Sequence, residues 1–381
     1  MRPQHGGNLT WAASLAGCSP SMILDFSASI NPLGPPHSAI AAIHNHLGDL
    51  RNYPDPNYHE LRQALSQFHR LPPDWILPGN GSAELLTWAS RELAELDVTY
   101  LLTPAFGDYL RSLKAFDTSV IRCPLNLAFP SITASATFAR AVGPSVQPQV
   151  QPQILPPILL DLPAQPAQLG LLLNNPHNPT GWLFSSKEIL PYLEQFTLVV
   201  IDEAFMDFLP PDQQQSLTES VLDYPNLVIL RSLTKFYSLP GLRIGYAIAH
   251  PDRLQRWQQW RDPWSVNTLA AAAAVAVLQD TTFQQQTWNW LIEARSQLFQ
   301  GLSDLPGLSP LASAANYLLV QSEHSVVQLQ QQLLKQNRIL IRDCMSFPEL
   351  GDRYFRVAVR TLPENQRLLE GLRAEAGRYK T

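Results

Sequence analysis

Three short apolar runs in the middle of the chain give the clearest signal of secondary structure. They cover residues 169–173, 198–201 and 227–230, and they consist almost entirely of Leu, Val and Ile. Runs of this length without alternating polar residues are typical of parallel strands that helices cover on both faces. The pattern therefore predicts an α/β fold with a mostly parallel central sheet flanked by helices.

Helical patterns occur between and after these runs. A glycine-rich turn at residues 79–81 leads into an apolar pattern at residues 85–89, and a capping box at residues 185–188 leads into another at residues 189–193. The second lies between two of the strands and predicts a crossover helix. An alanine-rich stretch at residues 268–278 predicts a buried helix, because it is far shorter than a membrane span.

Alternating residues near the end of the chain predict a strand with one cationic face. From residue 355 to residue 361, Arg356, Ala358 and Arg360 fall on one face and apolar residues fall on the other. Such a face can bind an anion. The alternative for any single arginine in this run is a surface ion pair.

The chain of 381 residues, 45% of them hydrophobic, is long enough for two domains that share a site. We predict an N-terminal segment at residues 1–45 that packs on a small domain, a large domain at residues 46–255 and the small domain at residues 256–381. Residues 130–168 are rich in Pro, Gln, Ala and Ser, which predicts a mobile surface insertion with one short strand near its end.

Composition indicates which partners and which cellular location to expect. The net charge is −5 and no dense basic run is present, so we expect no nucleic-acid partner. The N-terminus lacks the apolar core of a signal peptide, and we expect no membrane partner. The widely spaced cysteines Cys18, Cys123 and Cys344 form neither a disulfide framework nor a metal-ligand set. We therefore predict a cytoplasmic protein without a metal site.

Polar residues able to do chemistry follow each of the three strand-like runs. Asn178 follows the first run, Asp202 ends the second, and Lys235 follows the third. Because ligands bind outside the carboxyl ends of parallel strands, these three side chains are expected to converge. An amide, a carboxylate and an amine can then meet on one small molecule.

These residue types suit pyridoxal phosphate. The amine of Lys235 can form a Schiff base with the cofactor aldehyde once desolvation lowers its pKa. Asp202 can pair with a protonated pyridine nitrogen, which makes the ring an electron sink. Arg243 offers a planar fork for the phosphate, and Ser232 and Thr234 add hydroxyl donors. The turn at residues 79–81 can supply free amides, although an ordinary tight turn is the alternative.

Three motifs resemble the fold-type I, class I and II aminotransferases, especially the histidinol-phosphate aminotransferase branch. They are Asn-Pro-Thr-Gly at 178–181, Asp-Glu-Ala-Phe at 202–205 and Ser-Leu-Thr-Lys at 232–235, followed by Arg243. The resemblance implies a pyridoxal-phosphate transferase fold with a smaller α/β domain. It places Lys235 on the cofactor aldehyde, Asp202 on the pyridine nitrogen and Asn178 on the phenolic oxygen. The phosphate contacts that it implies are Ser82, Ala83, Ser232, Thr234 and Arg243.

Two aromatic residues also match this family. Phe106 takes the position of an aromatic residue that stacks on the cofactor ring, for which a phenyl face suffices. Tyr53, in Asn-Tyr-Pro-Asp-Pro, matches a tyrosine that reaches the cofactor phosphate of the neighbouring subunit. The resemblance therefore implies a homodimer with shared active sites.

The two ends of the chain resemble the threonine-phosphate decarboxylases of cobalamin synthesis. The matching segments are residues 5–8, 24–34, 342–344 and 354–361. This resemblance implies a small phosphorylated amino acid as substrate, L-threonine O-3-phosphate, which loses carbon dioxide to give (R)-1-aminopropan-2-ol O-phosphate. The substrate-binding residues that it implies are His5, Asn31, Arg342, Arg356 and Arg360. For His5, a solvated terminal side chain is the alternative.

Phe205 is a departure from the aminotransferase pattern. Aminotransferases of this branch usually carry Tyr there, whose hydroxyl bonds the phenolic oxygen of the cofactor, and Phe has no hydroxyl. Histidinol-phosphate aminotransferase is the alternative function. A third possibility is a non-catalytic module that senses a ligand for gene control or scaffolds a partner; such a regulator should carry a DNA-binding extension.

Overall fold

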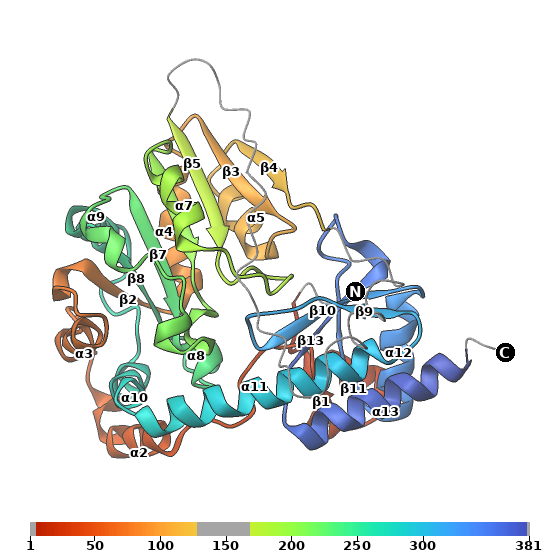
Figure 1. The fold of residues 1–381 in the computed structure, drawn as a ribbon. Helices are drawn as coiled ribbons and strands as arrows, with labels where there is room; N and C mark the ends of the chain where they lie inside the picture. The colour runs from red at the N-terminus through yellow and green to blue at the C-terminus, as the bar shows by residue number, and fades with distance from the viewer. Residues whose placement is uncertain (1–4, 128–167, 379–381) are drawn as a thin grey trace.

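A computed structural model describes residues 5–127 and 168–378, and its large domain is built on a seven-stranded sheet (Figure 1). The strand order is β2-β8-β7-β6-β5-β3-β4. Only β8 runs antiparallel to its neighbours, so the predicted mostly parallel sheet is confirmed. The strands are β2 (Ile76–Gly79), β3 (Val98–Thr103), β4 (Val120–Pro124), β5 (Leu169–Asn174), β6 (Leu198–Asp202), β7 (Leu227–Ser232) and β8 (Gly245–Ala249).

Helices cover both faces of this sheet, as the apolar runs predicted. Leu172 and Val200 face the helices α4 (Ser82–Leu93), α5 (Gly107–Lys114) and α9 (Pro251–Trp260). Their neighbours Leu171 and Val199 face the other side, where α3 (His59–His69), α7 (Ser186–Leu193), α8 (Leu233–Phe236) and α10 (Thr268–Leu278) contribute to the core. Both faces of the strands are therefore buried, which explains their unbroken hydrophobic sequence.

The helices predicted from local signals are confirmed. Helix α4 begins at Ser82, directly after the glycine-rich turn. Helix α7 begins after Ser185, whose hydroxyl accepts the amide of Lys187. Helix α10 is the alanine-rich stretch, and its Ala270, Ala273 and Ala274 are fully buried.

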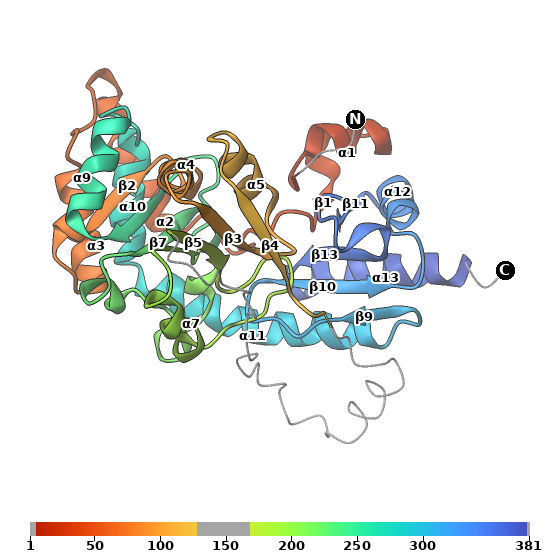
Figure 2. The same cartoon turned by 90° about the horizontal axis from the view of Figure 1, so that it is seen from above.

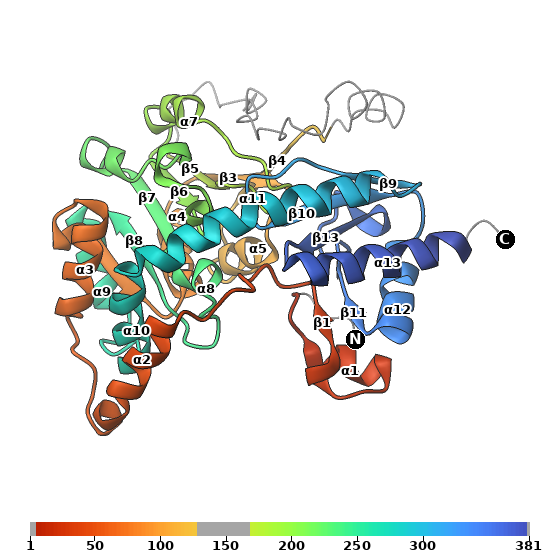
Figure 3. The same ribbon diagram turned by 60° about the horizontal axis from the view of Figure 1, so that its bottom comes forward.

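The small domain holds a four-stranded antiparallel sheet of order β12-β13-β10-β9. Its strands are β9 (Leu308–Pro310), β10 (Tyr317–Ser322), β12 (Arg342–Asp343) and β13 (Tyr354–Ala358). Helices α11 (Thr281–Ser303), α12 (Val326–Asn337) and α13 (Leu362–Arg378) surround it. Figure 3 shows α11 running from beside α10 to β9.

The strand predicted at residues 355–361 is shorter in the structure. Strand β13 ends at Ala358, so Arg356 lies within it and Arg360 lies beyond it. The residue opposite Arg356 in the antiparallel register is Arg342 of β12. The cationic face of the sheet is therefore formed by two arginines on neighbouring strands.

The N-terminal segment passes from the small domain to the large one. Helix α1 (Leu9–Ala16) packs on α12, and β1 (Leu24–Asp25) pairs in parallel with β11 (Ile339–Leu340), as Figure 2 shows. Helix α2 (His37–Asn45) then packs on α10. Short 3₁₀ turns complete the fold at η1 (Pro20–Met22), η2 (Leu47–Arg51), η3 (Pro73–Trp75), η4 (Met206–Phe208), η5 (Pro211–Gln213), η6 (Glu219–Leu222) and η7 (Gly351–Arg353).

The predicted domain limits at residues 46 and 256 stay predictions. The predicted insertion at residues 130–168 lies, apart from its last residue, outside the part of the chain that the structure describes. Among residues 5–127 and 168–378, no helix has both the length and the apolar character needed to cross a membrane.

Candidate active site

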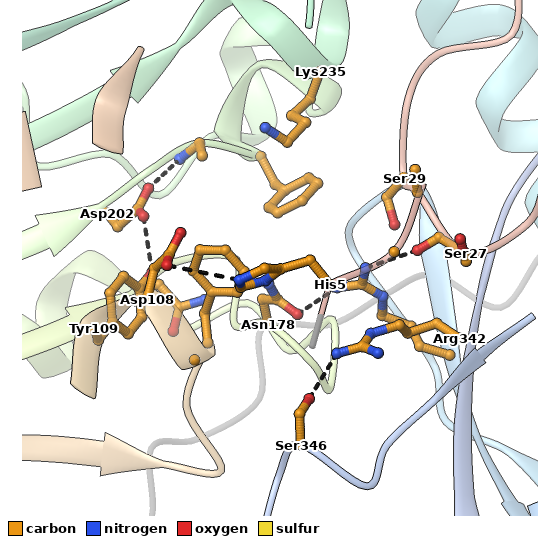
Figure 4. Close-up of a pocket in the computed structure, with 18 of the residues that line it drawn as sticks. His5, Ser27, Ser29, Asp108, Tyr109, Asn178, Asp202, Lys235, Arg342 and Ser346 are labelled. Atoms are coloured by element: carbon orange, nitrogen blue, oxygen red, sulfur yellow. Dashed lines mark hydrogen bonds and ion pairs between the residues drawn. The ribbon is translucent and has the colours of Figure 1, made fainter. Parts of the chain in front are cut away.

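A pocket of about 250 Å³ opens at the carboxyl ends of the parallel strands (Figure 4). Lys235 and Asp202 line it from the large domain, and Arg342 and Arg356 line it from the small domain. His5 reaches it from the N-terminal segment. The predicted convergence of polar residues at this edge of the sheet is therefore present.

Lys235 lies on α8, one turn after β7, and its amine points into the pocket. Its Nζ donates a hydrogen bond of 2.8 Å to the hydroxyl of Thr234. The pKa of Lys235 is lowered to about 8, chiefly by burial; the charge of Asp202 opposes this effect, and the charges of Arg243 and Arg356 add to it. Part of the amine is therefore neutral near physiological pH, the form needed for attack on a carbonyl.

Asp202 ends β6, and both of its oxygens accept hydrogen bonds. Oδ1 accepts the amide of Ala204 at 2.9 Å, and Oδ2 accepts the hydroxyl of Tyr109 at 2.8 Å. Burial raises the pKa of Asp202, while these two hydrogen bonds and Lys235 lower it. The carboxylate is thus held in one orientation at the end of its strand.

Tyr109 was missed by the sequence analysis. It is 2% exposed on α5, and burial and the charge of Asp202 raise its pKa well above the usual value, so it stays a proton donor. The available signal was its spacing: Tyr109 follows Phe106 by three residues, which places neighbouring side chains on one face at the start of a helix.

A cluster of hydrogen-bond donors lies beside Lys235. The hydroxyls of Ser232 and Thr234 are 2.8 Å apart. The guanidinium of Arg243 packs against Gly81, where any Cβ would collide with it, and Gly81 has a φ of +77°. Ser82, the first residue of α4, lines the pocket, so the helix N-terminus faces the same space.

These features fit pyridoxal phosphate. Hydroxyls, a guanidinium and a helix N-terminus suit an anionic tail, and Phe106 offers an aromatic face to the pocket. Within the described residues, Arg243 forms no ion pair. The buried Oδ1 of Asn174, also in the pocket lining, has no protein partner there. A polar ligand can satisfy both groups.

The opposite end of the pocket is cationic. Arg342 donates a hydrogen bond of 2.6 Å to the Ser346 hydroxyl. Arg356 donates to the side-chain oxygen of Asn178, and its guanidinium lies 4.9 Å from the ring centroid of Tyr317. Burial lowers the pKa of both arginines. Two partly desolvated guanidiniums at one end of a pocket form a binding site for anions.

Ser29 adds a donor at this end that sequence reasoning did not identify. It is 4% exposed, its hydroxyl has no partner among the described residues, and it lines the pocket near Arg342. A buried hydroxyl without a partner is costly, so its position in the lining favours contact with a bound ligand.

His5 and Asp108 form one wall. Nε2 of His5 lies 3.8 Å from a carboxylate oxygen of Asp108, and the His5 ring centroid lies 5.8 Å from that of Phe106. Asp108 also pairs with Arg111 at 2.7 Å. The sequence analysis placed His5 in the site but gave no role to Asp108.

Phe205 also lines the pocket. Its ring packs edge-on against Tyr317, with centroids 4.9 Å apart. This position therefore presents a phenyl face and no hydroxyl to the pocket.

Three predicted site residues lie elsewhere. Tyr53 is 79% exposed and stacks on Trp264. Asn31 is buried, and its side-chain amide donates to the carbonyl of Phe236 and the hydroxyl of Thr287. Arg360 pairs with Glu364 at 2.9 Å and donates to the carbonyl of Asp25, outside the pocket lining.

Ala83 follows Ser82 in α4 without lining the pocket itself. Ser232, Thr234 and Arg243 likewise lie beside Lys235 without being part of the lining. The roles predicted for all of the site residues stay predictions.

A buried ion network lies next to the site in the chain. Arg231, directly before Ser232, pairs with Glu203 at 3.0 Å and with Asp207 at 2.7 Å. Glu203 directly follows Asp202, and it also accepts the hydroxyl of Ser216. The network therefore ties together the ends of β6 and β7, which carry Asp202 and Lys235.

Comparison with known proteins places this geometry in a family. The sequence profile of aminotransferase class I and II matches residues 21–372. Threonine-phosphate decarboxylase from Salmonella typhimurium is 38% identical over 97% of this chain and 95% of its own length. Histidinol-phosphate aminotransferase from Symbiobacterium thermophilum is 33% identical over 91% of this chain and 89% of its own.

Two further matches extend this picture. An adenosylcobalamin biosynthesis bifunctional protein from Leptospira interrogans is 29% identical over 97% of this chain, which spans 40% of that protein. The crystal structure of histidinol-phosphate aminotransferase from Sinorhizobium meliloti, in complex with pyridoxal-5'-phosphate, superposes with a TM-score of 0.78. That match has 22% identity and covers 98% of this chain and 95% of the other. It shows that the fold is shared.

Proposed function

This chain belongs to the aminotransferase class I and II family, and from that premise we propose that it is a pyridoxal-phosphate-dependent decarboxylase of L-threonine O-3-phosphate. Its product is (R)-1-aminopropan-2-ol O-phosphate, used in cobalamin synthesis. One observation carries the proposal: a single pocket joins Lys235 and Asp202 to the paired guanidiniums of Arg342 and Arg356. A substrate with an amine, a carboxylate and a phosphate finds a partner for each group there.

The cofactor is held by residues of the large domain. Lys235 would hold its aldehyde, Asp202 its ring nitrogen and Asn178 its phenolic oxygen, and its phosphate would be held by Ser82, Ala83, Ser232, Thr234 and Arg243. Bound there, pyridoxal phosphate supplies an electron sink for a bond broken at the substrate α-carbon.

The protein residues decide which bond breaks. Arg342 and Arg356 orient the two anionic groups of the substrate and thereby set the position of its carboxylate. The α-carbon loses carbon dioxide and gains one proton in its place. Lys235, with a pKa of about 8, is suited to deliver that proton.

Histidinol-phosphate aminotransferase is the second candidate, supported by the 33% identical relative. Phe205 favours the decarboxylase, because the pocket lacks the hydroxyl that the aminotransferase branch usually supplies there. A ligand-sensing or scaffold module is less consistent with Lys235, whose depressed pKa suits a reactive amine rather than a structural one.

We further propose a cytoplasmic homodimer with shared active sites. Tyr53, Leu50 and Trp264 are 79%, 62% and 43% exposed, and Tyr53 stacks on Trp264. Such an apolar surface suits a second copy of the chain. In that dimer Tyr53 reaches the cofactor phosphate of the neighbouring subunit. Sedimentation of wild type and Leu50→Asp tests this: a monomer in both would contradict the proposal.

The deciding experiment measures both reactions with the cofactor-loaded protein. L-threonine O-3-phosphate is assayed for carbon dioxide release and for amino transfer to 2-oxoglutarate, and L-histidinol phosphate is assayed in parallel. Carbon dioxide release without amino transfer is expected. Amino transfer from histidinol phosphate alone would assign the protein to the aminotransferase function. The absence of both a cofactor absorbance band and any turnover would favour the sensing module.

A further inference from the structure

The short arm at residues 5–7 forms part of the pocket wall, although it is far from the other lining residues in sequence. His5 and Gly6 line the pocket, and the side chain of His5 is 50% exposed. Asn8, the next residue, caps helix α1 by accepting the amide of Trp11. The arm is therefore attached to the small domain at one end and faces Asp108 of the large domain at the other.

A specific contact fixes the arm. The amide of Gly7 donates a hydrogen bond of 2.8 Å to the hydroxyl oxygen of Ser27. That hydroxyl donates in turn to Oδ1 of Asp25 at 2.6 Å, and the Ser27 amide donates to the same oxygen at 2.7 Å. Since the Ser27 proton is directed to Asp25, its oxygen is left to accept the amide of Gly7.

The base of this contact is itself anchored. Asp25 lies on β1, opposite Leu340 of β11, and its carbonyl accepts a hydrogen bond from Arg360 at 3.1 Å. The carbonyl of Ser27 accepts one from Arg356, a pocket residue, at 3.4 Å. The residues that hold the arm are therefore connected to the sheet that carries the cationic end of the pocket.

Both glycines of the arm are required by this packing. A Cβ at Gly6 would overlap the carbonyl of Ser27, and Gly7 has a φ of +81°, which residues with side chains rarely adopt. The arm can therefore lie against Ser27 only if residue 6 has no side chain. This accounts for the paired glycines after His5.

We infer that Asp25 and Ser27 are positioning residues that seat the arm so that His5 meets the substrate. The inference rests on the proposed function, because it takes the phosphorylated end of the substrate as the group that His5 faces. Asp25 acts through Ser27. Ser27 also lines the pocket, but its hydroxyl is engaged by Asp25 and Gly7, so it acts through Gly7. Arg360, which the sequence suggested as a substrate contact, supports Asp25 from behind.

Two variants disrupt the contact between the arm and Ser27 in different ways. Ser27→Ala removes the acceptor of the Gly7 amide, and Gly6→Ala blocks the seat from the arm side without changing Ser27 or Asp25. Ser21→Ala is the matched control, since Ser21 is exposed on the same N-terminal segment and bonds only Ser19 among the described residues. His5→Ala removes the side chain that the arm presents.

The first readout is hydrogen exchange in the N-terminal peptide of the cofactor-loaded protein without substrate. Ser27→Ala and Gly6→Ala should exchange about tenfold faster than wild type, the effect expected for loss of one partly buried hydrogen bond. His5→Ala and Ser21→Ala should exchange at the wild-type rate. Wild-type exchange in both Ser27→Ala and Gly6→Ala would overturn the inference, whatever the substrate of the enzyme.

The second readout is steady-state kinetics. Ser27→Ala and Gly6→Ala should raise KM about fivefold with little change in kcat, because only binding of the phosphorylated group is weakened. The double variant His5→Ala/Ser27→Ala should be no worse than the more affected single variant. If the double variant raised KM by the product of the two single effects, action through His5 would be contradicted. An unchanged KM in Ser27→Ala and Gly6→Ala would contradict it as well.

If only histidinol phosphate is turned over, the proposed function fails, and the same KM comparison is made with that phosphorylated substrate.

Discussion

The hydroxyl of Tyr109 donates a hydrogen bond of 2.8 Å to Oδ2 of Asp202, and it is the side-chain donor that fixes this carboxylate. The bond lowers the pKa of Asp202 against the effect of burial. The charged form of Asp202, at the end of β6, is therefore favoured by a residue on helix α5.

Tyr109→Phe should weaken the enzyme without unfolding it. A hydrogen bond to a charged group contributes about 1.5–3 kcal/mol, so we expect kcat to fall by a factor of about 10 to 100. Cofactor affinity should fall as well, measured by equilibrium dialysis. Tyr246→Phe is a suitable control, because it removes a partly buried 2.8 Å hydrogen bond to His69 outside the pocket lining. Equal losses in both variants would exclude a specific role for Tyr109.

The amine of Lys235 should control how fast the apoprotein takes up pyridoxal phosphate. The pKa of about 8 lies below the usual 10.5, so the neutral amine becomes dominant as pH rises through about 8. The rate of uptake, followed by absorbance, should rise with pH around that midpoint. Asp202→Asn should move the midpoint lower, because the Asp202 charge raises this pKa. A rate independent of pH between 6 and 9 would argue against Lys235 as the reacting group.

The same depressed pKa has a consequence for stability. The amine is charged more readily in the unfolded chain than in the folded one, so the stability of the apoprotein should rise between about pH 8 and pH 10.5 from this group. Lys235→Ala should remove that contribution and abolish turnover. Lys187→Ala, at an exposed position on α7, should retain both.

Arg356→Lys should raise KM for the phosphorylated substrate about tenfold or more while leaving the charge of the pocket unchanged. The planar guanidinium of Arg356 donates to Asn178 and can bind an anion through two donors. Lysine has no such planar fork. Arg353→Lys, on the exposed turn η7, provides the control and should match wild type. An unchanged KM in Arg356→Lys would show that a point charge is sufficient at this position.

Phe205→Tyr tests the residue that departs from the aminotransferase pattern. The new hydroxyl faces the pocket, so the ratio of amino transfer to carbon dioxide release should increase. Both products are measured in one reaction mixture. Phe208→Tyr, in the neighbouring buried turn η4, controls for the added hydroxyl. A product ratio equal to that of wild type would mean that Phe205 does not influence the reaction outcome.

Arg231→Met should destabilise the protein by about 3–5 kcal/mol, because it leaves Glu203 and Asp207 buried without their cation. Burial already raises the pKa of both carboxyls. The loss should therefore shrink as pH falls and the carboxyls become protonated. Chemical denaturation at two pH values measures it, and Arg353→Met is the exposed control. A loss independent of pH would indicate that packing, not charge, accounts for the effect.

Local chemistry made the large-domain part of the site predictable. Asp202 and Lys235 follow strands with an unbroken apolar pattern, and the topology of a parallel sheet brings such residues to one edge. The register of β13 was less predictable, because the alternation of residues continues past Ala358 although the strand does not. Arg360 is consequently diverted to Glu364 and Asp25.

The positions of other site residues could not be predicted, because they depend on contacts with residues distant in sequence. Asn31 was predicted to meet substrate, yet its amide donates to Phe236 and Thr287, more than 200 residues away. Ser29 carries no local pattern that distinguishes it from an ordinary loop serine. Tyr53 is exposed in the single chain, so a role for it depends on a second copy.

The antiparallel register that sets Arg342 opposite Arg356 affects how the protein should be handled. Burial lowers the pKa of Arg356, and the charge of Arg342 lowers it further. Repulsion between two like charges on adjacent strands favours an anion bound nearby. The pocket should therefore acquire sulfate or inorganic phosphate from purification buffers. Preparations in such buffers should melt at higher temperature and react more slowly with substrate than those in chloride. Activity measurements on this enzyme thus require a buffer without oxyanions.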